Sequence, residues 1–459
     1  MSKKKPLPQE PIEAEIGDLS HDGRGVAHVD GKAVFVQGAL AGERVRFRLT
    51  RRQRRHDEGE VVEVLSASPD RVTPRCAHFG LCGGCALQHL DPAAQIRMKQ
   101  EVLAEALRRI GKVSPETWLP PLVAEHWGYR RKARLGVRYV AKKGRVLVGF
   151  RERRSSFVAD LERCEVLHPA VGERLTELAE LIGSLSIRER VAQIEMAQGD
   201  GPVVLIFRVL EPPTPGDIEL LHAFAARTGL HVYLQPGGIE TVAPLPGQQV
   251  ELSYALPAPD ATPVVEPLPT PDINLVFGPN DFTQVNLELN RLMVARALER
   301  LDPGPDDRVL DLFCGLGNFT LPIARRAAFV LGVEGDAGLV ERARANAEGS
   351  GLDDSRVRFE RADLYTEAAG EDPAAHWPWT RQAFDLALID PPRSGALQVL
   401  DPLVATGIRR LVYVSCYPGT LARDAGHLVE HHGFRLVAAG AMDMFPHTAH
   451  VESMAVFER

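Results

Sequence analysis

The sequence predicts an α/β protein with a doubly wound parallel sheet in its carboxyl-terminal part, preceded by an OB-like β-barrel and a central α+β domain. Strand-like and helix-like segments alternate from about residue 273 to the end, as in a doubly wound sheet. Residues 11–67 hold five short runs of β-forming residues between turn sequences, as in a small barrel. At 459 residues the chain is also too long for one hydrophobic core. We therefore expect domains at 1–67, 68–270 and 271–459.

Composition limits the class of protein. With 44% hydrophobic and 25% charged residues, the chain has the composition of a globular protein. Its basic start, MSKKKPLPQE, is followed by no apolar run, and no segment is long and apolar enough to predict a membrane span. We expect a cytoplasmic monomer. Its six cysteines should stay reduced there, and so bind metal or take part in chemistry rather than form disulfides.

The first domain is predicted to be an OB-like barrel. The turn sequences HDGRG and VDGK separate runs that are rich in β-branched residues. The stretch HDGRGVAHVDGKAVFVQGALAGERV resembles a TRAM domain, a small RNA-binding barrel. The expected strands are 14–16, 25–29, 32–36, 44–49 and 59–65.

Positive charge is concentrated in two segments, although the net charge of the chain is −7. Residues 44–55 hold seven arginines, and residues 130–154 hold a second group of arginines and lysines. A run of charge is usually a solvated face, but two separate basic segments in an acidic protein favour contacts with phosphate. Both segments are therefore candidate RNA contacts.

Four cysteines form a candidate metal site. Cys76, Cys82 and Cys85 have the spacing C-x5-C-x2-C, and Cys164 follows in LERCEVLH. Neighbouring glycines let the backbone wrap around a bound group and donate N–H groups to sulfur. Four thiolates suit either a [4Fe–4S] cluster or a structural zinc ion, and the spacing alone does not choose between them. The alternative, a set of unrelated core cysteines, would rarely have this spacing.

The central domain is expected to mix strands and helices. The apolar positions from Asp91 to Ile110 approximate a helical stripe. Residues 243–272 are rich in proline and are expected to form an irregular connector with one or two edge strands. Strand-like runs lie at 132–140, 145–150, 192–198, 202–210 and 231–235, and helix-like runs lie near 170–183 and 216–228.

The carboxyl-terminal domain carries a candidate nucleotide site. DLFCGLGNFT, residues 311–320, is a strand followed by a Gly-x-Gly turn, where Gly315 lets the backbone approach a ligand. Glu334 ends the next strand and can accept hydrogen bonds from both hydroxyls of a ribose. Because the third glycine of the dinucleotide fingerprint is absent, we favour S-adenosylmethionine over NAD. Asp363 is then placed to meet the adenine, and Asp390, in IDPPR, lies where the cofactor and a substrate base should meet.

The stretch VYVSCYPGT, residues 412–420, places a cysteine at the end of a buried strand. Pro418 blocks continuation of the strand and suits the first turn of a helix. Cys416 should therefore lie at a helix start, where catalytic groups gather and where the helix amino terminus lowers the pKa of a thiol. The alternative is that Cys416 is a small buried hydrophobic residue, which is how we interpret Cys314.

Several motifs occur in the same order as in the RNA 5-methyluridine methyltransferases, which the chain resembles over nearly its whole length. They are FTQVN, DLFCGLGNFTL, the strand end at Glu334, IDPPRSG, YVSCYPGTLARD and HTAHVESM, together with the four cysteines. The resemblance implies a Rossmann-like, S-adenosylmethionine-dependent methyltransferase that modifies carbon 5 of a uridine in RNA. The TRAM-like start favours the ribosomal RNA branch, with 23S RNA as substrate, because the tRNA branch typically lacks that domain and the cluster.

The resemblance also implies roles for individual residues. Cys416 would be the nucleophile that adds to carbon 6 of uracil, and Glu452 the base that removes the carbon 5 proton. Tyr417 departs from the family, which usually has Asn after the nucleophile, so the contacts of this turn are in doubt. A [4Fe–4S] cluster is implied at Cys76, Cys82, Cys85 and Cys164. Cofactor contacts are expected from Gln284, Phe313, Gly315, Asn318, Glu334, Asp363 and Asp390.

Other interpretations remain open. The family resemblance also implies that a helix near 95–117 packs on the methyltransferase domain, which would make the domain borders discontinuous. A tRNA 5-methyluridine methyltransferase is one alternative function. The sequence Asp390-Pro391-Pro392 also occurs in enzymes that methylate amino groups of nucleic acids and need no cysteine nucleophile. A third alternative is an RNA-binding iron–sulfur protein whose methyltransferase fold has lost its activity.

Overall fold

The computed structural model of the chain describes residue 7 and residues 10–256, 273–365 and 376–459. These residues form two compact units. The barrel unit comprises residues 1–102, 150–159 and 445–450. The sheet unit comprises residues 103–149, 160–444 and 451–459.

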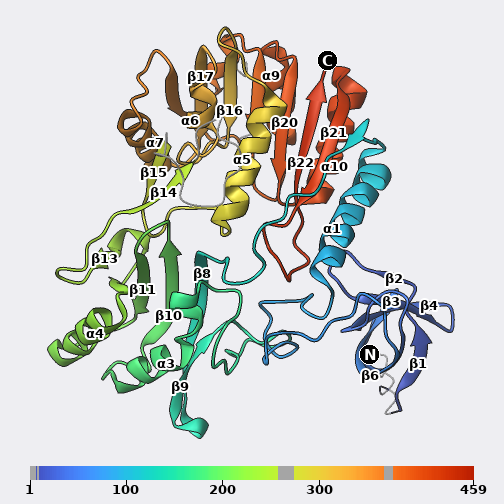
Figure 1. Cartoon of the computed structure of the whole chain (residues 1–459), viewed down its shortest axis with the longest axis vertical. Coiled ribbons are helices and arrows are strands. Elements are labelled where there is room, and N and C mark those ends of the chain that lie inside the picture. Colours follow the sequence, from blue (N-terminus) through green and yellow to red (C-terminus); the bar gives the residue numbers. More distant parts are fainter. Residues whose placement is uncertain (1–6, 8–9, 257–272, 366–375) are drawn as a thin grey trace. The chain divides into compact units, whose positions relative to one another are not determined.

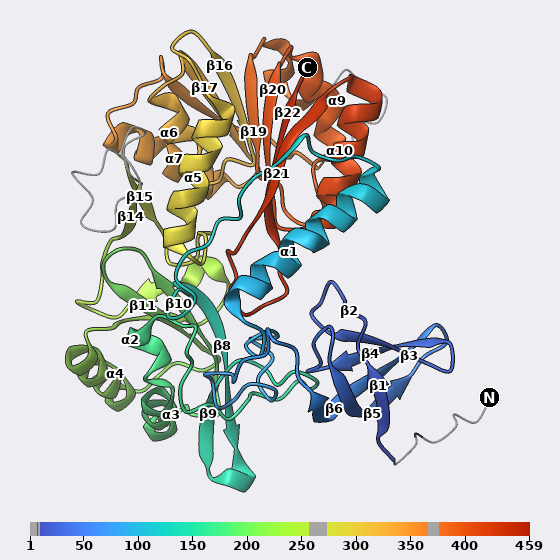
Figure 2. The ribbon, with the colours of Figure 1, turned by 45° about the vertical axis from the view of Figure 1, so that its right-hand side comes forward.

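The barrel unit begins with a six-stranded sheet in the order β1-β5-β6-β4-β3-β2, one strand more than predicted (Figure 2). Alternation of side chains explains the long strand β5: Val45, Phe47 and Leu49 are buried, while the arginines between them are exposed. Gly59 is needed opposite this strand because a Cβ there would lie 2.6 Å from the Phe47 ring. The strands are β1 (Ile12–Glu15), β2 (Asp18–Leu19), β3 (Gly25–Val29), β4 (Lys32–Gln37), β5 (Arg44–Arg52) and β6 (His56–Ser66).

Irregular backbone leads from the barrel to helix α1 (Pro92–Ala106), which starts near the predicted Asp91. An apolar cluster that includes Leu40, Leu87 and Met98 joins the barrel, the cysteine-bearing segment and this helix. Apolar contacts therefore hold together a region that has few strands and helices of its own.

The segment 445–450 is tied to α1 by buried polar groups. The Gln95 side chain accepts a hydrogen bond from the backbone N–H of His447 at 2.8 Å. The ammonium group of Lys99, a residue with no exposed surface, donates to the carbonyl of Phe445 at 2.9 Å. Buried polar groups need such partners, so these bonds fix the segment on the helix.

The sheet unit contains an eight-stranded sheet in the order β18-β17-β16-β19-β20-β22-β21-β7, as the alternating sequence pattern predicted (Figure 1). The first five strands in this order run parallel, and β22 is antiparallel to both of its long neighbours. The strands are β7 (Thr117–Trp118), β16 (Arg308–Leu312), β17 (Phe329–Glu334), β18 (Val357–Arg361), β19 (Leu386–Ile389), β20 (Arg410–Ser415), β21 (Arg435–Met442) and β22 (Glu452–Glu458).

Helices cover this sheet. Helix α5 contacts β19, β20 and β22 and crosses in front of the sheet in Figure 1, while α9 and α10 pack on each other. Helix α10 follows capping rules: Pro418 occupies its first turn, and Gly433 ends it in the left-handed conformation at φ 69°. The helices are α5 (Leu287–Leu301), α6 (Thr320–Ala324), α7 (Ala337–Gly349), α9 (Leu397–Ala405) and α10 (Pro418–His432).

The segment after α1 also belongs to the sheet unit. A π-helix, η1 (Leu107–Gly111), packs against α10 so closely that a Cβ on Gly111 would lie 2.3 Å from the carbonyl oxygen of Ala422. Leu103 and Leu107 are fully buried in the core of this unit. Strand β7 then pairs with β21 at the sheet edge.

A second six-stranded sheet, β13-β12-β11-β10-β8-β9, follows the predicted central α+β pattern. The proline-rich connector predicted at 243–272 contains β13 and β14 (Leu252–Leu256), which pairs with β15 (Ile273–Phe277); residues 257–272 lie outside the described ranges. The remaining elements are β8 (Lys132–Val140), β9 (Arg145–Gly149), β10 (Val191–Gln198), β11 (Val203–Val209), β12 (His231–Gln235), β13 (Ala243–Pro244), α2 (Pro169–Gly172), α3 (Leu175–Ser184) and α4 (Pro215–Thr228).

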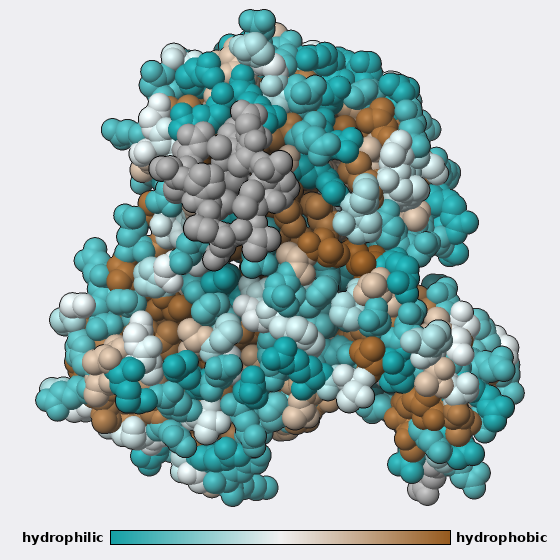
Figure 3. All heavy atoms as spheres, in the orientation of Figure 1, coloured by the Kyte–Doolittle hydropathy of each residue, from teal (hydrophilic) through white to brown (hydrophobic). Residues whose placement is uncertain are grey.

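Within the described ranges, no helix is long and apolar enough to cross a membrane. Hydrophilic side chains cover most of the face drawn in Figure 3, with apolar side chains in smaller patches.

Candidate active site

The carboxyl ends of parallel strands gather the candidate residues at one edge of the eight-stranded sheet. Strands β17, β16, β19 and β20 pair in parallel register, so their carboxyl ends face the same way. The residues at or just beyond these ends are Glu334 on β17, Phe313 after β16, Asp390 after β19 and Cys416 after β20. Sequence segments that are about 100 residues apart therefore meet at one site.

The turn after β16 has the backbone conformation of a ligand-binding loop. Gly315 and Gly317 have φ values of 55° and 98°, and even Phe313 has a φ of 64°. The N–H of Gly315 donates to the Glu334 carboxylate at 3.1 Å. The other oxygen of Glu334 accepts from the N–H of Asp336 at 3.0 Å. The carboxylate predicted to hold a ribose is thus oriented by backbone groups on two sides.

An aromatic pair lies beside the residue predicted to meet the adenine. Asp363 follows β18, and its carboxylate accepts from the N–H of Tyr365 at 2.9 Å. The rings of Phe313 and Tyr365 lie 5.7 Å apart. Burial raises the pKa of the Tyr365 hydroxyl, with a further contribution from the Asp424 carboxylate. Tyr365 was not predicted from the sequence, yet its ring contacts Phe313 and its hydroxyl donates to the Gly395 carbonyl at 3.2 Å.

The other two predicted cofactor contacts lie near α5. The side-chain amides of Asn318 and Asn290 exchange two hydrogen bonds of 2.9 Å, and Tyr254 donates to Asn318 Oδ1 at 2.9 Å. Asn318 is therefore fixed by neighbours that the sequence did not indicate. Gln284 is half-buried just before Asn286, the residue that caps α5.

Two carboxyl groups, the buried Asp311 and the half-buried Asp390, lie together at the ends of β16 and β19. Asp311 has no exposed surface, and Thr320 donates to one of its oxygens at 2.5 Å. Burial raises the pKa of Asp311 to about 8, and the carboxylates of Asp390 and Glu334 contribute to the rise. Burial likewise raises the pKa of Asp390 well above its usual range. Such a site disfavours additional negative charge and favours a cation.

Antiparallel pairing brings Cys416 and Glu452 together. Strand β22 inserts beside β20, with Ser415 opposite Ser453. The next pair in this register is Cys416 and Glu452, and Ser453 Oγ reinforces it by donating to the Ser415 carbonyl at 3.1 Å. Glu452 is only 3% exposed. The arrangement sets a thiol and a buried carboxylate side by side at the sheet edge.

The electrostatic environment of Cys416 contradicts one prediction. A helix start was expected to lower its pKa, but burial raises the pKa of this thiol to about 11, and the carboxylates of Glu452 and Asp390 add to the rise. Arg393 opposes the change without reversing it. Desolvation and the two carboxylates raise the pKa of the thiol by more than the helix dipole lowers it. The thiol therefore stays protonated until a nearby positive charge or a base compensates for them.

The loop after Asp390 is fixed by a buried aspartate that sequence reasoning missed. One oxygen of Asp424, a fully buried residue on α10, accepts from the Tyr413 hydroxyl at 2.7 Å and from the N–H of Ala396 at 2.8 Å. Gly395 has a φ of 80°, and a Cβ there would lie 2.7 Å from the same oxygen. A charged residue on the otherwise apolar face of α10 was the available signal.

The turn at Tyr417 lacks a side-chain cap. Tyr417 is the N-cap residue of α10, and its side chain makes no capping hydrogen bond. The Ser415 hydroxyl accepts from the N–H of Tyr417 at 3.2 Å instead. The substitution for Asn therefore leaves the position of Cys416 intact but removes a capping group.

Three of the four predicted metal-binding cysteines lie in the barrel unit. The N–H of Gly84 donates to Cys82 Sγ at 3.4 Å. Arg153 donates to the carbonyl of Cys85 at 2.6 Å. Burial raises the pKa of Cys82, and the nearby Cys76 thiolate adds to the rise. The loop thus directs one backbone N–H at a cysteine sulfur and brings the thiols of Cys76 and Cys82 near each other.

These cysteines do not form a compact set of ligands. Within the described ranges, the one group of three or more potential ligand atoms lying within 4.8 Å of each other contains no cysteine. A single zinc ion would need its sulfurs about 4 Å apart, whereas a four-iron cube holds its thiolates farther apart. Among the described residues, the three cysteines of the barrel unit are therefore not arranged around a single ion. Cys164 belongs to the sheet unit, where its N–H donates to the Gly172 carbonyl at 2.8 Å.

The first basic segment divides into paired and exposed arginines. Arg44 pairs with Glu13 at 3.0 Å, and Arg46 pairs with Glu63 at 2.7 Å. Other arginines of the segment are exposed, and no ion pair within the described part of the chain involves them. They are Arg48, Arg51, Arg52, Arg54 and Arg55.

In the second basic segment many cations have structural partners. Arg134 pairs with Glu195 at 3.0 Å, and both Lys143 and Arg145 pair with Asp160. Burial lowers the pKa of Lys132 to about 8, and its ammonium group donates to backbone carbonyls near residue 280. This segment is therefore a weaker candidate for phosphate contacts than residues 48–55.

The chain is similar to known proteins over its whole length. The family model described as tRNA (Uracil-5-)-methyltransferase matches residues 263–459, and the TRAM domain model matches residues 9–62. A protein of Alkalilimnicola ehrlichii, described as 23S rRNA (uracil(1939)-C(5))-methyltransferase RlmD, is 56% identical over 100% of this chain and 98% of its own length. One of Methylococcus capsulatus with the same description is 53% identical over 100% of this chain and 99% of its own.

A solved structure shares the fold. It is the tRNA (uracil-54, C5)-methyltransferase of Pyrococcus abyssi in complex with S-adenosyl-L-homocysteine, with a TM-score of 0.69 and 24% identity over 97% of this chain and 99% of that one. The assignment of this chain to a family depends on its full-length matches to the two bacterial relatives. The chain belongs to the RNA uracil-C5 methyltransferase family.

Proposed function

We propose that the protein transfers a methyl group from S-adenosylmethionine to carbon 5 of a uridine in 23S ribosomal RNA, through a covalent adduct between Cys416 and carbon 6. The observation that carries this proposal is the strand register that sets Cys416 beside Glu452 at the edge where Asp390 and Glu334 end their strands. A thiol next to a buried base is what this chemistry requires and what amino-group methylation does not need.

The reaction follows from the weak nucleophilicity of carbon 5. The Cys416 thiol first gives its proton to the solvent. The thiolate sulfur then adds to carbon 6, and the electrons of the ring double bond move toward the carbonyl at carbon 4, so that carbon 5 becomes nucleophilic. Bound S-adenosylmethionine supplies the methyl group and a positive charge. Glu452 then removes the carbon 5 proton, the ring double bond re-forms and the bond between sulfur and carbon 6 breaks.

The raised pKa of Cys416 fits such a cycle. The free thiol stays protonated because burial, together with the carboxylates of Glu452 and Asp390, raises its pKa. A cationic cofactor in the same pocket would offset the two carboxylates and favour the thiolate once both substrates are bound. The low thiolate content of the free protein also protects the nucleophile from oxidation.

Ribosomal RNA is the favoured substrate because the two bacterial relatives compared above, each more than 50% identical over the full chain, are described as 23S enzymes. A tRNA substrate is the weaker alternative, since the tRNA enzyme of Pyrococcus abyssi is only 24% identical. A stacked uridine cannot reach Cys416, so the target must be flipped out of its helix. The exposed arginines at 48–55 would hold neighbouring phosphates while this happens.

We also propose that Cys76, Cys82, Cys85 and Cys164 bind a [4Fe–4S] cluster. The Gly84 N–H directed at Cys82 Sγ supports it. Cys164 is included on the sequence resemblance. A bound cluster would order a loop that has little regular secondary structure.

A covalent trap tests the reaction. Glu452→Gln should still allow addition and methyl transfer and then stall, because the carbon 5 proton stays on the ring. The stalled species is a protein–RNA adduct that carries the methyl group and survives denaturing electrophoresis. RNA containing 5-fluorouridine should trap the wild-type protein in the same way, because fluorine cannot leave as a cation.

Two controls separate the roles. Cys416→Ala should lower methylation by about 10⁴-fold or more and should form no adduct, either alone or combined with Glu452→Gln. Normal turnover by Glu452→Gln, or methylation retained by Cys416→Ala, would contradict the assigned roles and favour amino-group methylation. A wild-type protein that binds no S-adenosylmethionine would instead indicate an inactive RNA-binding protein.

A further inference from the structure

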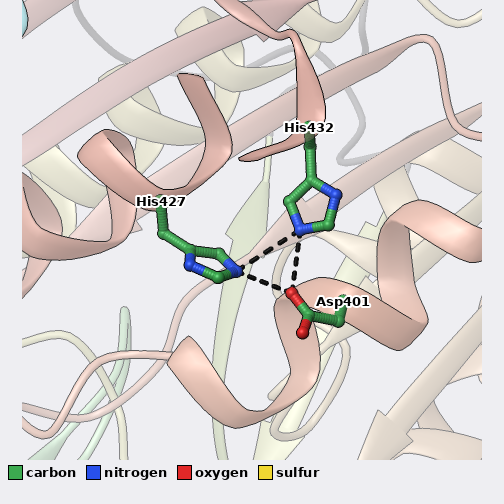
Figure 4. Close-up of side chains that lie close together, drawn as sticks. All are labelled: Asp401, His427 and His432. Atoms are coloured by element: carbon green, nitrogen blue, oxygen red, sulfur yellow. Dashed lines mark hydrogen bonds and ion pairs between the residues drawn. The ribbon is translucent and has the colours of Figure 1, made fainter. Parts of the chain in front are cut away.

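A cluster of three ligand-type side chains lies on the outside of the sheet unit, on the two helices that flank β20. Asp401 lies on α9, while His427 and His432 lie on the last two turns of α10. Figure 4 shows that both imidazole rings turn a nitrogen toward the same carboxylate oxygen. The distances from Asp401 Oδ1 are 2.6 Å to His427 Nε2 and 2.8 Å to His432 Nε2.

The spacing of these atoms is close to that of a metal site. The two Nε2 atoms lie 3.3 Å apart. In a tetrahedral zinc site with bonds of 2.0–2.1 Å, neighbouring ligand atoms lie about 3.3 Å apart. The Asp401 oxygen would have to withdraw by only about half an ångström to reach that distance, and its side chain is 68% exposed and able to move.

When the histidines are neutral, hydrogen bonds do not pair every donor of this cluster with its own acceptor. Both Nε2 atoms must carry hydrogen to donate to Asp401, which leaves two N–H groups facing each other across 3.3 Å. A cation bound by both nitrogen lone pairs and the carboxylate removes that conflict. The site is also at the carboxyl end of α10, where the helix dipole favours positive charge.

We propose that Asp401, His427 and His432 bind a divalent zinc ion, with water as the fourth ligand. Two imidazoles and one carboxylate are a ligand set that suits zinc, and they disfavour magnesium, which prefers oxygen ligands. The side chains of His427 and His432 are 24% and 19% exposed, so the ligands are held in place while the open side admits water.

The ion would not take part in methyl transfer. Helix α10 has 15 residues, so its carboxyl end lies about 22 Å from the turn that bears Cys416. A zinc ion here would instead link α9 to α10, the helices before and after the strand that leads to the nucleophile. The inference therefore stands independently of the proposed reaction.

Zinc content measured on the full-length protein tests the proposal. The wild-type protein and the His427→Ala, Asp401→Asn and His431→Ala variants would be dialysed together against dilute zinc chloride and analysed for zinc by mass spectrometry. His431 is the matched control, because its ring lies 4.8 Å from that of His427 but contributes no atom to the cluster. The cysteines are unchanged in all four proteins, so any zinc that they bind adds the same amount to each measured zinc content.

We expect the wild-type and His431→Ala proteins to hold one more zinc ion per chain than His427→Ala and Asp401→Asn. All four should methylate RNA at the same rate. Equal zinc content in all four would overturn the proposal and leave a hydrogen-bonded cluster. Anomalous scattering at the zinc edge from wild-type crystals needs no variant, and the absence of a peak between the three side chains would overturn it as well.

Discussion

The sheet unit and the barrel unit position their functional side chains in different ways. In the sheet unit, Glu334, Asp390 and Cys416 follow directly from strand ends, and the pairing of β20 with β22 fixes Cys416 opposite Glu452. In the barrel unit, the cysteine segment 76–85 is held by single backbone hydrogen bonds and glycine contacts rather than by a sheet. Strand pairing thus positions the first group of side chains, whereas isolated loop contacts position the second.

The charges of the two regions differ as well. The site in the sheet unit gathers carboxyl groups whose pKa values are raised by desolvation, among them the buried Asp311 and the half-buried Asp390. The outer face of β5 and the turn after it present exposed arginines. A buried acid changes the charge and pKa of the few groups beside it. Exposed arginines attract RNA phosphates over a longer distance, and dissolved salt weakens that attraction. Substitutions should therefore have large, local effects in the first region and graded, salt-dependent effects in the second.

The largest expected effect in the barrel unit follows loss of a cysteine. Anaerobically purified wild-type protein should be brown and contain about four iron and four sulfide per chain. Cys82→Ser should lose most of this iron, because a hydroxyl is a poor ligand for the cluster. Cys314→Ser, which alters a buried core cysteine, should keep it. Stoichiometric zinc and no visible absorbance in the wild-type protein would show that the site is not an iron–sulfur site.

The next effect concerns the pKa of Cys416. Because burial and two carboxylates raise it to about 11, the rate of alkylation by iodoacetamide should rise about tenfold per pH unit between pH 7 and 10, without a plateau. Glu452→Gln removes one of the opposing charges, so the pKa should fall and alkylation at pH 8 should become several-fold faster. Mass spectrometry of the peptide that contains Cys416 measures this rate.

Glu458→Gln is the matched control, since Glu458 ends the same strand and pairs with Arg410 at 2.9 Å. It should alkylate at the wild-type rate. A plateau near pH 7, or slower alkylation in Glu452→Gln, would mean that the free thiol is already ionised and that the helix dipole dominates after all.

A smaller effect is expected at the basic face of the barrel. Replacing Arg51, Arg52 and Arg55 by Gln should weaken RNA binding and reduce its salt dependence by about one unit of slope for each phosphate that is no longer bound. The Arg44→Gln, Arg46→Gln protein is the control, because these two arginines already pair with glutamates. Equal slopes in all proteins, measured by RNA titration at several salt concentrations, would show that the exposed arginines are only a solvated face.

The sequence predicted the sheet more fully than the site. Strand positions from β16 to β22 followed from apolar runs and glycine turns, because these depend on local periodicity. Strand β22 could be predicted, but its insertion between β20 and β21 could not, because antiparallel register is set by packing across the sheet. The resemblance named both Cys416 and Glu452, whereas residue types alone indicated only the cysteine.

The wrong prediction and the missed residues share one cause, which is contact between residues that are distant in sequence. The lowered pKa predicted for Cys416 was wrong because the prediction counted the helix start and could not count burial or the two carboxylates. Tyr365 and Asp424 were missed because each acts through partners that are distant in sequence. Asp311 had a visible signal, a carboxylate within an apolar strand, and it proved to be fully buried.

The smallest expected effect concerns the cap of α10. It tests whether a side-chain cap at Tyr417 affects the position of Cys416, which the pairing of β20 with β22 already fixes. Tyr417→Asn restores a side chain that can accept a hydrogen bond from the first turn of α10, and it should raise the free energy of unfolding by about 1 kcal/mol. Tyr417→Ala is the control, because it removes the ring without adding a cap.

Denaturant titration measures the stability, and the yield of the 5-fluorouridine adduct measures the position of Cys416. We expect the adduct yield to stay unchanged, because Ser415 remains paired with Ser453 in every variant. A marked fall in yield for Tyr417→Ala alone would mean that the tyrosine ring, which is 48% exposed, contacts the RNA.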